Sequence, residues 1–295
     1  MNGNEWLTQR FEANRGHLRA MAYRMVGSLS EADDAVQEAW LRVSRAGAGG
    51  VDNLEGWFTT VVARVCLNIL RSRKSRREES LEVEGATPLV VVDTKNVSPE
   101  RQAVLAESVG LALLVVLERL TPAERIAFVL HDVFDVAFED IGAAVGRSVV
   151  AARQLASRAR RRVRGMPRGS GAAISAQRET IEAFLAALRA GDMDGLLAIL
   201  DPDVVRRADR FSSPAGPRDL RGARAVAEEA LKFRDIARFA RLIEVNGSGG
   251  IVVAPGGHLR TVISCKVKRH RISKMEVIAN PERLRKLDLA VFTGE

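Results

Sequence analysis

The chain has 295 residues, 46% of them hydrophobic, so its composition is that of a globular protein, and its length favours two or three domains. Its formal net charge of +8 favours an acidic partner, either nucleic acid or an anionic membrane. The sequence has no apolar run of the roughly 18 residues that a membrane span needs, and no signal-peptide pattern at its N-terminus. Its two cysteines and four histidines form no metal-binding spacing. We therefore expect a cytoplasmic protein without a membrane segment, a metal or a cofactor.

Residues 1–77 are expected to form a helical domain. Ser30 and Asp33 have the spacing of a capping box, which predicts a helix over residues 31–45. The inward stripe of this helix consists of side chains at helical spacing, Ala35, Ala39, Trp40 and Val43. The opposite face carries the polar side chains Asp34, Gln37 and Glu38. From the residues alone, this is an ordinary solvated face.

A second helix of this domain changes from apolar to basic along its length. The segment over residues 53–77 reads NLEGWFTTVVARVCLNILRSRKSRR, and five of its last seven residues are basic. Such an end lies either in water or against an anion, so we expect the helix to be buried at one end and to meet a polyanion at the other. Residues 78–97, which follow, are acidic and lack a helical period. They are expected to form a linker.

Residues 98–164 predict a second helical domain that ends in a helix-turn-helix. Serine and proline at 98–99, and a capping box at 121–124, each mark the start of a helix. A Gly-Arg-Ser turn joins the last two helices, which are expected over residues 138–145 and 149–164.

The last of these helices has an apolar face and a basic face on a helical wheel. The core side consists of Ala152, Leu155, Ala156, Ala159 and Val163. The opposite side consists of Gln154, Ser157, Arg158, Arg161 and Arg164. Arginine and glutamine can hydrogen-bond guanine and adenine edges in the major groove, so this helix is expected to read duplex DNA.

After a Gly- and Pro-rich linker at 165–173, residues 174–295 predict an α+β domain. Helices are expected over 176–190, 193–200 and 223–233, and strands over 204–208, 238–245, 251–254, 259–267 and 271–278. Turns rich in glycine join the later strands, which favours helices packed on a curved antiparallel sheet. The sequence contains no catalytic constellation. Three carboxylates near a strand, Asp201, Asp203 and Asp209, are more often caps or surface groups than general bases.

Three segments together closely resemble the extracytoplasmic-function sigma factors of bacterial RNA polymerase. QEAWLRV at 37–43 and the segment at 53–77 resemble sigma region 2, and residues 121–164 resemble sigma region 4. Residues 174–295 resemble a SnoaL-like cone domain of the nuclear-transport-factor-2 (NTF2) type, which one sigma subfamily carries as a C-terminal extension. The resemblance implies a multi-domain fold with two all-α sigma domains followed by an α+β domain.

The resemblance also implies roles for individual residues. The face with Asp34, Gln37 and Glu38 is expected to bind core RNA polymerase, which presents its beta and beta-prime subunits. The −10 element is expected to contact Asn53, Thr60, Arg64, Asn68, Arg71, Arg73 and Lys74. The −35 element is expected to contact Arg153, Gln154, Ser157, Arg158 and Arg161. Asn280, Pro281 and Leu284 match a C-terminal signature of the subfamily and are expected to form a cis-regulatory motif.

The expected function is that of a non-enzymatic sigma factor, which binds core polymerase and directs initiation at −35/−10 promoters. The C-terminal domain is expected to modulate this activity in cis. One alternative is a one-component regulator that binds DNA and senses a small ligand in the C-terminal domain. The other is an enzyme, with the SnoaL-like domain acting as a small-molecule cyclase or isomerase, because one fold can host both catalysts and binding modules.

Overall fold

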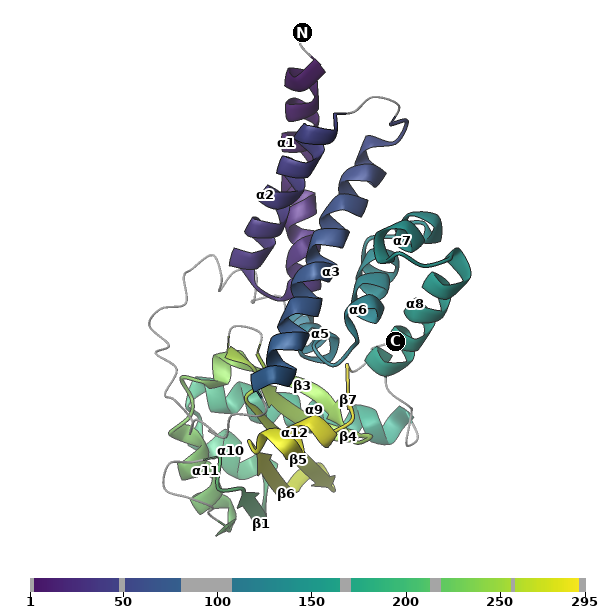
Figure 1. Ribbon diagram of the computed structural model, residues 1–295. Helices are drawn as coiled ribbons and strands as arrows, with labels where there is room; N and C mark the ends of the chain where they lie inside the picture. The colour runs from purple at the N-terminus through teal and green to yellow at the C-terminus, as the bar shows by residue number, and fades with distance from the viewer. Residues whose placement is uncertain are drawn as a thin grey trace. The chain divides into compact units, whose positions relative to one another are not determined.

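A computed structural model describes residues 3–47, 51–80, 108–164, 171–212, 219–255 and 258–291 of the chain (Figure 1). It has two compact units: residues 1–85 with 117–161, and residues 86–116 with 162–295. Most of the expected linker at 78–97, the helix start expected at 98–99, and residues 165–170 of the second linker lie outside the described residues.

The first unit begins with three long helices, α1 (Gly3–Val26), α2 (Leu29–Ala46) and α3 (Leu54–Ser80). Each contributes an aromatic ring to their common core. The Phe11 ring of α1 lies 5.0 Å from that of Trp40 on α2 and 5.1 Å from that of Phe58 on α3, measured between centroids. Aromatic pairs at this separation add to the stabilisation from buried apolar area.

The predicted cap of α2 is wrong by two residues. The helix begins at Leu29, and its N-cap is Ser28, whose hydroxyl accepts a hydrogen bond from the backbone N–H of Glu31. Ser30 therefore lies inside the first turn and cannot cap. Serine is a favourable cap at either position, so composition alone did not distinguish the two. The small inward residues Ala35, Ala39 and Val43 are buried, as their spacing predicted.

The helix-turn-helix follows in the same unit. It contains α6 (Pro122–Phe128), a π-helical turn over Val129–Val133, α7 (Phe138–Val145) and α8 (Val149–Arg164). The predicted capping box at the start of α6 is present, with Thr121 and Glu124 bonded reciprocally. The chain turns between α7 and α8 at Gly146, which has the left-handed angles φ 69 and ψ 43. All five predicted core residues of α8 are buried.

The second unit is an α+β domain built on one mixed sheet of seven strands (Figure 1). The strands lie in the order β2-β1-β6-β5-β4-β3-β7. Their bounds are Leu200–Ala208 (β1), Leu220–Arg221 (β2), Ala240–Val245 (β3), Ser248–Val253 (β4), Thr261–Lys268 (β5), Arg271–Ile278 (β6) and Leu289–Ala290 (β7). The helical elements are α5 (Ser108–Leu117), α9 (Gly171–Ala190), α10 (Met193–Ile199), α11 (Ala223–Leu231), a 3-10 turn (Ala237–Phe239) and α12 (Pro281–Lys286).

The expectation of a purely antiparallel sheet is wrong for one pair of strands. β1 and β6 are parallel, whereas every other pair within the described sheet is antiparallel. The described chain between them contains α11 and four further strands, β2 to β5, and β6 lies beside β1 in the same direction. Strand periodicity shows which face a residue is on, but it does not show strand direction.

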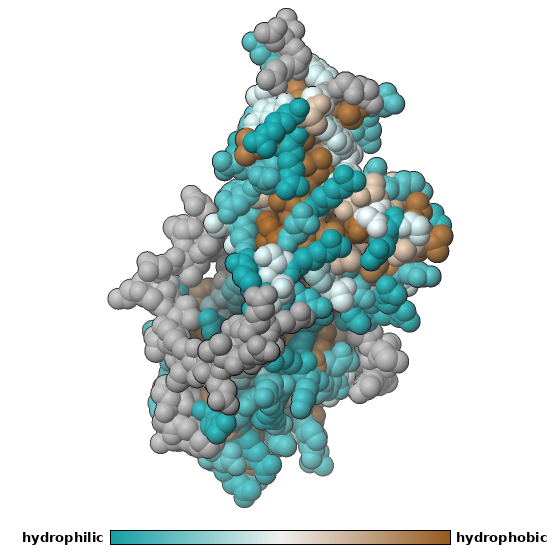
Figure 2. Space-filling view, in the orientation of Figure 1, coloured by the Kyte–Doolittle hydropathy of each residue, from teal (hydrophilic) through white to brown (hydrophobic). Residues whose placement is uncertain are grey.

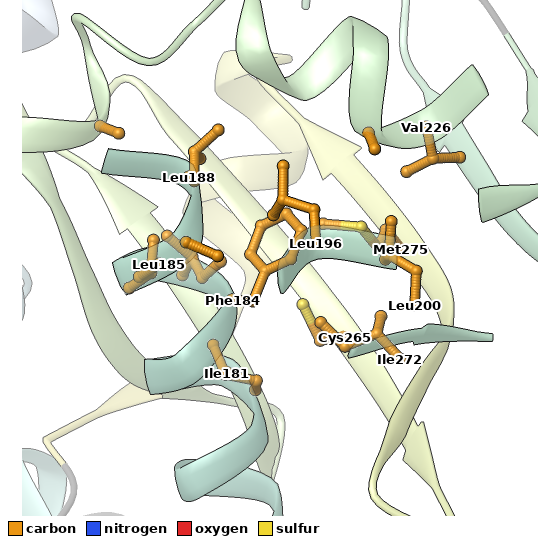
Figure 3. Packing of buried hydrophobic residues seen from close by; sticks show 14 of the residues in the cluster. Ile181, Phe184, Leu185, Leu188, Leu196, Leu200, Val226, Cys265, Ile272 and Met275 are labelled. Carbon is orange, nitrogen blue, oxygen red and sulfur yellow. The ribbon is translucent and has the colours of Figure 1, made fainter. Parts of the chain in front are cut away.

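The core of this domain lies between the sheet and α9, α10 and α11. Figure 3 shows Phe184, Leu196 and Met275 directed toward one another from α9, α10 and β6. Cys265 lies in the same cluster at 1% exposure, and burial raises the pKa of its thiol to about 12. The described interior between helices and sheet is therefore largely filled by apolar side chains.

Asp209 joins the end of β1 to the end of β6. One of its carboxylate oxygens accepts from the Phe211 N–H (3.1 Å) and the Ser212 hydroxyl (2.8 Å). The other accepts from the N–H groups of Ala279 (3.0 Å) and Asn280 (2.9 Å). Burial alone would raise the pKa of Asp209, but these hydrogen bonds outweigh burial and hold the pKa below its ordinary value of 3.8.

We expect Asp209→Asn to destabilise the second unit by about 1–3 kcal/mol, because the amide NH₂ would face two N–H donors and leave them unpaired. The measurement is labelling of the Cys265 thiol in rising urea, with Asp203→Asn on the same strand as control. Asp209 stabilises the wild type above its ordinary pKa, and this stabilisation is lost as pH falls through the lower folded-state pKa. Equal urea midpoints for both variants would contradict the role of Asp209.

Candidate nucleic-acid and polymerase interface

An exposed polar stripe runs along α3. Arg64, Asn68 and Arg71 are exposed and lie at i, i+4 and i+7, which places them on one face. Lys74 continues toward the basic end and is also exposed. Asn53, just before the helix, caps it, because its Oδ1 accepts from the N–H of Gly56 at 2.9 Å.

Two other residues predicted for the −10 element are differently placed. Thr60 is buried at 9% exposure, so its hydroxyl does not lie on the open face. Arg73 is partly buried, and its guanidinium donates to the Glu31 carboxylate (2.9 Å) and the Val26 carbonyl (2.7 Å). Arg73 therefore ties α3 to the junction between α1 and α2, a structural contact that the sequence pattern did not reveal.

Arg64 contacts the helix-turn-helix of the same unit. Its Nε and Nη2 both donate to the Ala143 carbonyl on α7, at 3.2 and 2.9 Å. Both hydrogen bonds are solvent-exposed, so their net contribution to stability is modest. In this arrangement, one of the −10 candidates is already engaged by the helix-turn-helix.

Arg125 of α6 is buried nearby, at 3% exposure. Burial is the main cause that lowers the pKa of its guanidinium to about 10; the charge of Glu118 opposes this shift, and the charge of Arg73 adds to it. Its Nη2 lies 3.4 Å from the Arg24 carbonyl on α1, and its Nε has no hydrogen-bond partner in the described part of the chain. The packing of α6 on α1 thus contains a buried, incompletely satisfied cation.

The predicted −35 residues do lie together on the exposed face of α8. Two of them also have local contacts. Arg153 lies over the Phe138 ring, 5.4 Å from its centroid, and the Nε of Arg158 lies 3.4 Å from the buried Glu124 carboxylate. Because Glu124 belongs to the α6 capping box, Arg158 helps to hold the helix-turn-helix together. Gln154, Ser157 and Arg161 are exposed on the same face.

Sequence reasoning missed Val150, which is 64% exposed at the start of α8. It lies three, four and seven residues before Arg153, Gln154 and Ser157, and so on the same face of the helix. Figure 2 shows hydrophobic surface at the edge of α7 and α8. The N-terminal residues of a recognition helix contact base edges, and an apolar side chain suits the thymine methyl group. The helical wheel of residues 149–164 places Val150 on the same face as Gln154. Valine was not considered there because apolar residues are usually buried.

The predicted polymerase-binding face of α2 contains a second missed residue. Asp34 and Gln37 are exposed, and Glu38 forms a 2.9 Å ion pair with Arg42. Leu41, which is 40% exposed, lies on the same face at i+3 from Glu38. An apolar side chain among polar ones is typical of the centre of a protein interface.

The C-terminal motif makes a helix start. Asn280 is the N-cap of α12 and accepts from the Arg283 N–H at 3.0 Å, Pro281 occupies the first turn, and Leu284 is buried at 7% exposure. These contacts give Asn280, Pro281 and Leu284 a local structural role.

Asp201 of β1 accepts a hydrogen bond from the Asp203 N–H at 2.9 Å, so its carboxylate also has a local structural role.

Within the described residues, no three His, Cys, Asp or Glu side chains form a group that could hold a metal ion. In the same part of the chain, no helix is both long and apolar enough to cross a membrane.

Comparison with known proteins gives two family matches. The family of sigma-70 region 2 matches residues 10–76, and that of sigma-70 region 4 matches residues 110–163. The ECF RNA polymerase sigma factor SigJ of Mycobacterium tuberculosis is 37% identical over 289 residues, covering 92% of this chain and 91% of SigJ. The probable ECF RNA polymerase sigma factor SigI of the same organism is 31% identical over 285 residues, covering 96% of this chain and 97% of SigI.

A crystal structure of M. tuberculosis SigJ aligns with 94% of this chain and 98% of its own, at 33% identity and a TM-score of 0.44. The two matched sigma regions and the sequence relationship over nearly the whole length decide the classification. The chain belongs to the extracytoplasmic-function (ECF) sigma factors of bacterial RNA polymerase.

Proposed function

We propose that this ECF sigma factor binds core RNA polymerase through the exposed face of α2 and contacts promoter DNA through α3 at −10 and α8 at −35. The observation that carries the proposal is the two-sided character of these helices. α3 and α8 each bury an apolar face and expose a face rich in arginine and amide side chains. Exposed cations on a helix suit phosphates, and arginine and glutamine suit base edges.

For the −10 element, Arg64, Asn68, Arg71 and Lys74 are the preferred contacts on α3. Asn53 lies at the helix start, where a flipped base would be held. Thr60 would need a neighbouring side chain to move, and Arg73 would need to leave Glu31, so we rank both lower. Two of the five N–H donors of Arg64 bond the Ala143 carbonyl, so its remaining donors are the ones available to DNA in this arrangement.

For the −35 element, Gln154, Ser157 and Arg161 are the preferred contacts on α8, joined by Val150. Arg153 and Arg158 are also exposed, but Arg153 contacts the Phe138 ring and Arg158 contacts the Glu124 carboxylate. Each would have to lose or share that contact on binding DNA. This distinction matters for mutagenesis, because a change at Arg158 alters both the DNA face and the cap of α6.

We further propose that the α+β domain modulates activity in cis, with the Asn280–Leu284 segment as part of the regulatory surface. The domain is joined to α8 through residues 165–170, and its core cluster is apolar, with Arg206 as a buried cation of β1, which favours a regulatory module over an enzyme. A one-component regulator that senses a ligand would leave the region 2 match at residues 10–76 without a purpose.

The polymerase contact is tested at Leu41. We expect Leu41→Ala to weaken binding to core polymerase about tenfold, because a central apolar contact in an interface contributes about 1–2 kcal/mol. Binding is measured by titrating labelled protein with core enzyme. Phe233→Ala, an equally exposed apolar side chain in the second unit, is the control and should leave affinity unchanged. Equal affinities for both variants would exclude Leu41 from the interface.

The −35 contact is tested by separating base reading from phosphate binding on α8. We expect Val150→Ser to reduce the preference for thymine at one −35 position by about 1 kcal/mol without changing salt dependence. Arg161→Ala should weaken binding by about 1–3 kcal/mol. Competition between promoter variants for holoenzyme measures both effects. Val133→Ser, also an exposed valine of this unit, is the control. Unchanged base preference in Val150→Ser would contradict the thymine contact.

Cis-modulation is tested by run-off transcription with core polymerase on genomic fragments. We expect deletion of residues after 170 to change transcript yield about fivefold or more, the range of a typical coupling free energy. The three tryptophans, at positions 6, 40 and 57, all lie in the first unit, so their fluorescence checks that this unit stays folded. Identical yields with and without the domain would refute modulation.

A further inference from the structure

The hairpin of β5 and β6 in the α+β domain is strongly basic. Its nine residues from Lys266 to Lys274 include five cations, Lys266, Lys268, Arg269, Arg271 and Lys274, together with His270. We name these five cations the basic hairpin. All are exposed except Lys274, which is half-buried. None of them has a carboxylate within ion-pair distance in the described part of the chain.

Strand register places like charges opposite each other. Lys266 pairs with Lys274, and Lys268 pairs with Arg271, across the antiparallel ladder. Like charges directly opposite destabilise a strand pair, whereas opposite charges at the same positions would stabilise it. The hairpin thus keeps two repulsive pairs that a stable fold does not need.

The turn of the basic hairpin has a second unfavourable feature, the residues at its two central positions. Arg269 and His270 both have left-handed backbone angles, with φ 49 and φ 59. A two-residue turn of this kind favours Asn-Gly, and other side chains are strained there. The neighbouring hairpin of β3 and β4 uses Asn246-Gly247 at the equivalent positions. The same domain can therefore make this turn with the usual residues, yet it has an arginine at the tip of the basic hairpin.

The other side chains of the hairpin argue against a membrane or a single-stranded nucleic acid as the anionic partner. Val267, Cys265 and Ile272 turn toward the domain core, so the outer face offers no apolar group for membrane insertion. Residues 261–278 contain no Phe, Tyr or Trp on which a single-stranded base could stack. The nearby Glu276 is bonded to Arg283 at 2.5 Å and does not neutralise the face.

The cationic row extends beyond the hairpin. Lys274 pairs with Val205 of β1, which pairs with Arg221 of β2, so Arg221 lies in line with Lys266 and Lys274. Neighbouring strands are about 4.8 Å apart, and alternate residues along a strand are about 6.7 Å apart. Arg221, Lys274 and Lys266 therefore lie in one row across the sheet, with Val205 between Arg221 and Lys274, and such a row of cations suits an extended polyanion.

We propose that the basic hairpin binds the phosphate backbone of duplex DNA, as a sequence-independent contact additional to those of α3 and α8. Lysine and arginine supply most contacts to phosphates, and the hairpin has no Phe, Tyr or Trp beside them. Each phosphate neutralised releases counterions, so the contact predicts a defined share of the salt dependence of DNA binding.

The test measures binding of the full chain to a labelled 30-base-pair duplex without promoter-like sequence, by fluorescence anisotropy over a range of KCl concentrations. The variant replaces Lys266, Lys268, Arg271 and Lys274 by Thr, which is favourable in strands. We expect the slope of log K against log salt to fall by about two to four, and affinity at low salt to fall at least tenfold. Its matched control removes four exposed cations from the helical side of the same domain, Arg178, Arg224, Lys232 and Arg234, each replaced by Gln.

A second variant, Lys266→Glu with Lys268→Glu, guards against loss of folding. It removes the same total charge but creates opposite-charge pairs with Lys274 and Arg271, so the hairpin should become more stable while DNA binding weakens. Protection of the Cys265 thiol, which lies beneath the hairpin at 1% exposure, reports that the domain is folded.

Equal slopes of log K against log salt for variant, control and wild type would overturn the proposal. So would variants that keep full DNA binding but lose binding to core polymerase, because the face would then dock on a protein. Neither result depends on promoter recognition by α8.

Discussion

The first unit depends on the burial of α3 against two sets of neighbours. The helix packs on α1 and α2, and also on α6 and α7. Its apolar residues, such as Val62 and Cys66, supply that common core, and their burial leaves only one face of the helix for DNA. The same packing brings the Ala143 carbonyl to Arg64. Region 2 and region 4 are therefore not independent in this arrangement, because a group proposed to bind the −10 element also holds the helix-turn-helix.

The contact between α6 and α1 contains one buried cation among apolar residues. A buried guanidinium whose pKa is lowered by burial opposes packing, and an apolar residue of similar volume is often neutral or more stable at such a site. Arg125 also lacks a partner for its Nε among the described residues. Opening the contact would return this cation to water and recover part of its desolvation free energy. The buried cation therefore lowers the stability of this contact.

Sequence patterns predicted the elements better than their connections. Helical period and Gly146 were sufficient for α7 and α8, because local spacing determines which side of a helix is buried. The parallel pairing of β1 with β6 could not be predicted, because it depends on the path of the intervening chain. At the candidate interface, the residue types and the exposure of the polar face of α8 were predictable from the sequence. The ion pair of Arg73 with Glu31 and the burial of Thr60 were not, because they depend on other helices that pack against α3. Exposed Val150 and Leu41 were overlooked because an apolar residue suggests core in any sequence pattern.

The net positive charge of the chain separates into two populations with different physical roles. Some cations are held by local carboxylates, such as Arg73 by Glu31 and Arg160 by Asp132, whose hydrogen bond raises the pKa of Arg160. These pairs orient helices and contribute little to the distant field, because their charges cancel. Others, such as Arg161 on α8 and Lys268 on the basic hairpin, have no such partner among the described residues and dominate the potential outside the protein. Since mobile ions screen the second population more strongly than the partly buried pairs, added salt should weaken DNA binding before it weakens the fold.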